Sequence, residues 1–88
     1  MNPELKSRVR EALTRVIALP GCNPHVFALA TSYLVTGDFV RVSYARVRFT
    51  APVFEQAFWL MLWVHLGREE LVRGYLAELN RLTKHYEP

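Results

Sequence analysis

Ala57-Phe58-Trp59-Leu60-Met61-Leu62-Trp63-Val64-His65-Leu66 is the stretch that decides the fold, because only His65 in it can ionise. A helix over this stretch is apolar all round and must be covered on every side. A chain of 88 residues buries only roughly 60 to 65% of its unfolded surface, so we expect it to use a second copy as cover. The sequence therefore predicts a homodimer with these residues in its interface: Phe54, Phe58, Trp59, Leu62 and Trp63.

Three arginines stand shortly before the apolar stretch, at Arg41, Arg46 and Arg48. The formal net charge of +3 and the isoelectric point of about 9.4 suit an anionic partner. Arginine is also well suited to contact phosphates and guanine edges. We therefore expect the segment 41–56 to contact double-stranded DNA through the following side chains: Arg41, Tyr44, Arg46, Arg48, Thr50 and Gln56.

Start signals for helices occur twice in the first part of the chain. Asn2 and Asn23 each precede a proline, and asparagine is a favoured cap while proline suits the first helical position. The first helix is expected to run to about Leu19, and the second to Thr36 with Gly37 as its C-cap. Because the second helix carries scarcely a charge, we expect it in the centre of the fold.

Two further helices are predicted after residue 50. The first runs from Ala51 to Leu66, and Gly67 breaks or bends it. The second runs from Arg68 to about His85 and is amphipathic. The chain is thus predicted to be a single domain, residues 1–88, with a mainly α fold.

The segment 38–49 fits two patterns. As a helix, it has Val40, Tyr44 and Val47 on one stripe and Asp38 as its N-cap. As a strand, it alternates apolar and polar residues from Val40 to Tyr44, until the phase slips after that residue. We rank the helix first, which gives four to five helices with a helix-turn-helix-like centre. The alternative is one short strand near 43–49.

The residues Tyr33-Leu34-Val35-Thr36-Gly37, followed further on by Thr50 and Phe54, resemble the helix-turn-helix of PapB-like fimbrial adhesin regulators and, more distantly, of TrfB-like plasmid repressors. In such proteins one helix lies across the DNA backbone and the next enters the major groove. The resemblance implies a positioning helix over 38–47, a turn at 48–50 and a recognition helix from Ala51 onward. It also implies a small dimeric transcription regulator of bacterial, plasmid or phage origin.

The residues 47–53 also resemble the strand-to-helix junction of ribbon-helix-helix repressors, and 67–73 resemble the start of the second helix of that family. In that family a strand pairs with its dimer mate and lies in the major groove. This resemblance implies that Tyr44, Arg46 and Arg48 point at the bases. We rank the helix-turn-helix first because its pattern also accounts for residues 33–37.

Spacings that indicate catalysis or metal binding are not found in the sequence. The histidines and Cys22 are scattered, without a Cys-x-x-Cys or His-Glu-x-x-His pattern. We therefore expect no enzyme, no cofactor and no metal. A single cysteine excludes an internal disulfide and favours a reducing compartment, so we expect the cytoplasm. The apolar run is about half of the roughly 20 residues that span a membrane, so we expect no membrane insertion.

A function of another class is also open, that of a small helical protein-interaction module or inhibitor. Trp59 and Trp63 stand at i and i+4 of the expected helix, so they share one stripe. Tryptophan is a frequent anchor at protein interfaces. In this alternative the apolar helix 54–66 docks on a partner protein.

Overall fold

The structure, a computed structural model of the chain, describes residues 1–40 and 47–86. Within these two ranges the chain forms helices and no strand. The helices are α1 (Pro3–Ile17), α2 (Pro24–Thr36), α3 (Pro52–His65) and α4 (Glu69–Lys84). The predicted mainly α fold is therefore confirmed, and its helices begin and end within a few residues of the predicted bounds.

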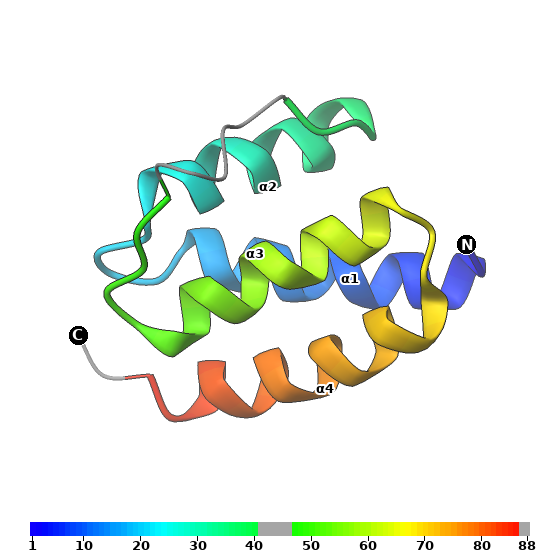
Figure 1. Cartoon of the computed structure of the whole chain (residues 1–88). Coiled ribbons are helices and arrows are strands. Elements are labelled where there is room, and N and C mark those ends of the chain that lie inside the picture. Colours follow the sequence, from blue (N-terminus) through cyan, green and yellow to red (C-terminus); the bar gives the residue numbers. More distant parts are fainter. Residues whose placement is uncertain (41–46, 87–88) are drawn as a thin grey trace.

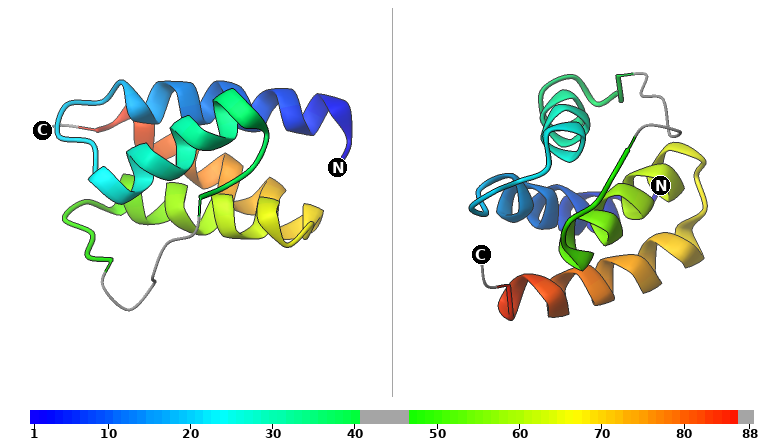
Figure 2. Two further views of the ribbon diagram at one scale, coloured as in Figure 1. Left: turned by 90° about the horizontal axis from the view of Figure 1, so that it is seen from above. Right: turned by 60° about the vertical axis from the view of Figure 1, so that its left-hand side comes forward.

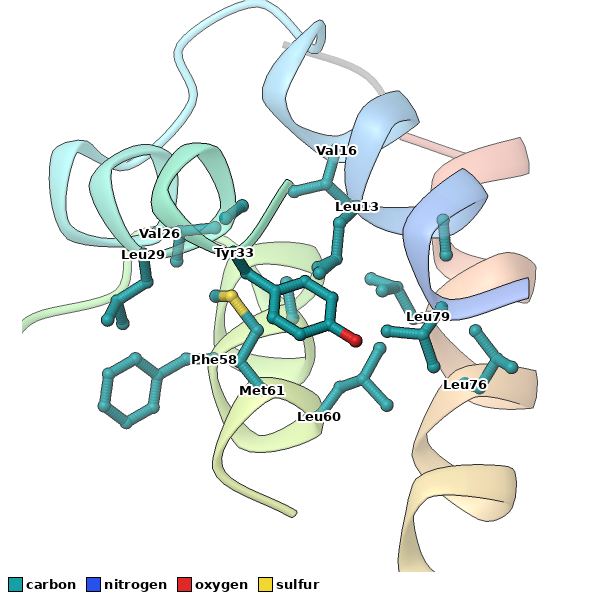
Figure 3. Packing of buried hydrophobic residues seen from close by; sticks show 14 of the residues in the cluster. Leu13, Val16, Val26, Leu29, Tyr33, Phe58, Leu60, Met61, Leu76 and Leu79 are labelled. Atoms are coloured by element: carbon teal, nitrogen blue, oxygen red, sulfur yellow. The ribbon is translucent and has the colours of Figure 1, made fainter. Parts of the chain in front are cut away.

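α3 lies against α1, with α2 and α4 on opposite sides of this pair (Figures 1 and 2). α3 contacts each of the other three helices and packs most extensively against α4. The buried side chains of all four helices meet in one core (Figure 3). Its largest fully buried members are Phe54, Leu5, Leu13, Leu60, Leu76, Leu79, Val9, Val16, Val26 and Val72.

α2 lies at the edge of this arrangement, and its expected central position is wrong. Its inner face is buried through Val26, Leu29 and Tyr33, but Phe27 is 47% exposed and Val35 is 78% exposed. The absence of charge on α2 therefore does not mark a helix that is covered on all sides. The better-covered helix is α3, since three helices share its inner face.

The helix termini follow the capping signals in the sequence. Asn2 Oδ1 accepts from the N–H of Glu4 at 2.8 Å, and Asn23 Oδ1 accepts from the N–H of His25 at 2.9 Å. Gly37 ends α2 with a φ of 81°, and Gly67 has a φ of 70° in the turn between α3 and α4. Glycine adopts this left-handed backbone without the steric cost that other residues meet.

The segment between α2 and α3 differs from both predicted patterns. Its described parts, residues 38–40 and 47–51, are neither helix nor strand. The positioning helix over 38–47 is therefore wrong at both described ends, and the strand near 43–49 is absent at 47–49. Residues 41–46, which include part of both predictions, lie outside the described residues.

Side chains provide the physical reason for the irregular backbone. The N–H of Asp38 donates to Thr36 Oγ1 at 3.1 Å, and Ser32 Oγ donates to the carbonyl of Asp38 at 2.9 Å. At the other end, Asn23 Nδ2 donates to the carbonyl of Arg48 at 2.8 Å. Such bonds offer backbone groups partners other than those of a helix or a sheet, so the local propensity of the segment does not decide its structure.

The double use of Asn23 leads to a stability prediction. Asn23→Ala removes an N-cap, which costs about 1 kcal/mol, and also the bond to the Arg48 carbonyl, which adds about 1 kcal/mol. Asn2→Ala is the matched control, because its side chain caps α1 and its hydrogen bonds to described residues stay within the first turn of that helix. Urea unfolding should give a loss for Asn23→Ala about twice that for Asn2→Ala, and equal losses would contradict the role of the bond to Arg48.

Candidate interaction surface

α3 buries one face and leaves the opposite face open. The buried face consists of Val53, Phe54, Ala57, Phe58, Leu60 and Met61. On the opposite side, apolar residues recur at spacings of three and four, which places them on one face of the helix. We call these residues the α3 strip: Trp59, Leu62, Trp63 and Leu66.

The α3 strip is in part open to solvent. Trp59 is 37% exposed and Leu66 is 56% exposed, while Leu62 and Trp63 are half-buried. The Trp63 ring packs against Tyr75 of α4 with 6.2 Å between ring centroids. Its Nε1 atom is buried and has no hydrogen-bond partner among the described residues. Packing on Tyr75, rather than a hydrogen bond, therefore holds the indole in place.

The residues predicted for the dimer interface lie on two different faces of α3. Phe54 and Phe58 are 1% and 3% exposed, because the other three helices cover their face of α3. Phe54 packs on Tyr86 and Phe58 on Phe49, with 5.5 and 5.2 Å between ring centroids. These two residues belong to the core of the chain itself, which corrects their placement in an interface. Trp59, with Leu62 and Trp63, lies on the open face, and their predicted contact with a second copy stays a prediction.

Leu66 was not among the residues predicted for the dimer interface, but it belongs to the α3 strip. Leu66 follows the last residue of α3, and its spacing of i+4 from Leu62 and i+7 from Trp59 puts it on the same face. The same spacing places Glu55 at the other end of the α3 strip. Helical periodicity was thus sufficient to place both residues on this face. Composition alone was not, because it treats the whole apolar run as buried.

The residues predicted to contact DNA are placed only in part. Arg41, Tyr44 and Arg46 lie outside the described residues. Arg48 and Thr50 are exposed on the segment that leads into α3.

The start of α3 does not present the face of a recognition helix. Gln56 is half-buried there, and only Glu55 among residues 53–58 is an exposed side chain. A helix that reads bases places several polar side chains in the groove. The buried side of α3 therefore gives little support to the expected recognition helix from Ala51 onward.

Charges of both signs alternate on the outer helices. On α1, Arg8 and Arg15 are exposed in the neighbourhood of Glu11, and the Arg15 guanidinium donates to the side chain of Asn80 at 2.7 Å. On α4, Arg81 forms an ion pair with Glu78. Since mixed charges give a weak field for a polyanion, the outer faces of α1 and α4 are not strong candidates for a DNA surface.

Burial lowers the reactivity of two groups near the core. It raises the pKa of the Cys22 thiol above its ordinary value, which disfavours the nucleophilic thiolate. It also raises the pKa of Tyr33, against the opposing charge of Arg10, whose guanidinium carbon lies 6.0 Å from the centre of the Tyr33 ring. Arg10 also donates to the Leu34 carbonyl near the end of α2 at 2.8 Å, so Arg10 and Tyr33 serve packing between α1 and α2.

Neither a metal site nor a membrane-spanning helix is formed by the residues that the structure describes. Among residues 1–40 and 47–86, no group of three or more His, Cys, Asp and Glu side chains is arranged to hold a metal ion. None of the helices formed by these residues has the length and apolar character that a membrane crossing requires.

Comparisons with protein-family models, with curated proteins and with solved structures give no match to this chain. The resemblances to PapB-like, TrfB-like and ribbon-helix-helix regulators therefore stay predictions from the sequence.

Proposed function

We propose that the protein is a small helical interaction module that binds another protein chain through the α3 strip. The observation that carries the proposal is the division of α3: its inner face is buried by the chain, and its outer face keeps large apolar side chains in contact with water. Clusters of exposed apolar residues on soluble proteins mark interaction surfaces. Tryptophan, here Trp59 and Trp63, is among the residues most often found to anchor them.

The aromatic rings of the α3 strip are supported by the fold before a partner binds. Trp59 packs edge-to-face on Phe58 with 5.7 Å between ring centroids, and Trp63 packs on Tyr75. Binding a side chain that is already ordered loses less conformational entropy than binding a free one. The apolar area removed from water, at about 25 cal/mol per Å², then contributes to affinity with a smaller entropic cost.

Cys22 is the only cysteine in the chain, and we propose the cytoplasm as the place of this function. Burial of the thiol fits a structural cysteine rather than a catalytic one. The proposed activity is accordingly binding, without a chemical reaction.

A photoreactive side chain on the α3 strip tests this function. p-Benzoylphenylalanine in place of Trp59 is expected to form a discrete adduct with a protein chain when the producing cells are illuminated, because the ring would lie in the proposed interface. The matched control is the same replacement at Ala77, which is exposed on α4. Adduct formation is measured by gel shift of the tagged chain.

The second variant in this experiment adds Leu66→Ser to the chain with the photoreactive residue at 59. Leu66 is 56% exposed, so the change should leave the fold intact and lower the adduct yield. Equal yields from positions 59 and 77, or an adduct that Leu66→Ser does not reduce, would overturn the proposal.

Binding of double-stranded DNA through the segment 41–56 is the second candidate function, and Arg48 favours it. Its side chain is exposed and makes no hydrogen bond or ion pair with another described residue. Its carbonyl is held by Asn23, and Thr50 is exposed close by. A guanidinium and a hydroxyl on a fixed backbone suit contacts to phosphate groups, as expected for a small DNA-binding regulator.

Arg48→Ala separates this second candidate from the first. If Arg48 contacts a phosphate, the variant should bind mixed-sequence duplex DNA more weakly and the slope of log affinity against log salt should flatten by about one unit. Arg73→Ala, which removes an exposed arginine from α4, is the control. Fluorescence anisotropy at a series of salt concentrations gives both quantities, and unchanged DNA affinity in the Arg48 variant at low salt would exclude this role.

A further inference from the structure

The α3 strip has an ionised side chain beyond each end. Glu55 stands in the first turn of α3, on the same face as Trp59 and Leu66. Arg68 follows the other end of the helix directly after Gly67. Both side chains are exposed, and neither forms an ion pair or hydrogen bond with another residue of the described ranges. Along the chain, the strip is therefore preceded by an acid and followed by a base.

We infer that the α3 strip binds the α3 strip of a second copy of this chain, with the two helices antiparallel about a two-fold axis. The inference rests on the proposed function and names its partner. In an antiparallel pair, the beginning of one helix lies beside the end of the other. Glu55 of each copy therefore meets Arg68 of its mate, while Leu62 and Trp63 lie near the axis.

Charge selects this orientation over the parallel one. In a parallel pair, Glu55 would lie beside Glu55 of the mate and Arg68 beside Arg68, and like charges repel. The antiparallel pair replaces both repulsions with attractions. A two-fold interface also uses the same patch on both copies and closes at two, so one strip per chain is sufficient.

The other acids near Arg68 do not compete for this role. Glu69 Oε1 accepts the backbone N–H of Asn2 at 2.7 Å, which turns it toward α1. Glu70 is exposed on α4 and shares its face with Arg73 and Ala77 by helical spacing. This face lies away from Tyr75, the residue of α4 that contacts the α3 strip. Among residues 68–70, Arg68 is therefore the one we assign to the pair with Glu55 of the second copy.

The exposed apolar face of α2 is a weaker alternative for self-association. Phe27 and Val35 are exposed there, but α2 contains no Asp, Glu, Lys or Arg. Charged ends are what give an interface its register and orientation. Next to α2, the described residues provide only Asp38, directly after Gly37, whereas the α3 strip has a charge of each sign, one beyond each end.

The size of the surface sets the strength of the expected dimer. Stable interfaces bury roughly 800 Å² on each partner, which the α3 strip alone does not supply because Leu62 and Trp63 are already half-buried. Half-buried neighbours such as Phe49 and Tyr75 must therefore contribute to the interface. We expect a dissociation constant on the order of micromolar rather than nanomolar.

Charge reversal in the whole chain tests the inference by sedimentation equilibrium. Glu55→Arg and Arg68→Glu should each weaken the dimer about tenfold, because each variant places two like-charged pairs in the interface. The double variant restores opposite charges and should dimerise like the original chain. Arg73→Glu makes the same change of charge away from the strip and should have no effect.

Each remaining outcome counts against the inference. A chain that stays monomeric at its highest soluble concentration does not bind itself through α3; an adduct to a different protein from position 59 would then leave the proposed function standing. A dimer that the single variants do not weaken uses another surface. Single variants that weaken it without rescue by the double variant overturn the antiparallel pairing.

Discussion

The inner face of α3 must be covered by three helices at once, and the other elements are arranged to meet this requirement. Leu60 is 0% exposed and Phe54 is 1% exposed, so water is excluded from the inner face of α3. α1 and α4 are themselves joined at their surfaces, where Arg15 donates to Asn80 at 2.7 Å. Because α3 has few polar residues, much of the face that remains uncovered between Glu55 and Arg68 is apolar. The α3 strip is thus a direct consequence of how the core is built.

The position of α2 depends on a single polar residue as well as on the core. Asn23 is the buried polar residue among those described, and its side chain joins the start of α2 to the backbone of Arg48. A buried polar side chain stabilises a fold when its hydrogen bonds are satisfied. Here the bond to the Arg48 carbonyl holds the segment that leads into α3. The start of α2 and the start of α3 are therefore fixed relative to each other.

The sequence predicted the helices well because their signals are local. Asn2 with Pro3, Asn23 with Pro24, and Gly37 act on the residues beside them. The segment 38–49 could not be predicted in this way, since the bond that holds one end of it comes from Asn23, which is 25 positions from Arg48. The apolar run predicted that α3 would be buried, but not on which side. Which side of α3 is buried depends on how the other helices pack. Their packing places Phe58 in the core and leaves Trp59 at the surface.

We propose that association covers the open face of α3, and tryptophan fluorescence tests this proposal most directly. The chain contains two tryptophans, and both Trp59 and Trp63 belong to the α3 strip. On dilution through the micromolar range the dimer should separate, so we expect acrylamide to quench the tryptophan emission more strongly. The far-ultraviolet circular dichroism should stay constant, because the helices remain folded. Quenching that is the same at every protein concentration would contradict association through the open face of α3.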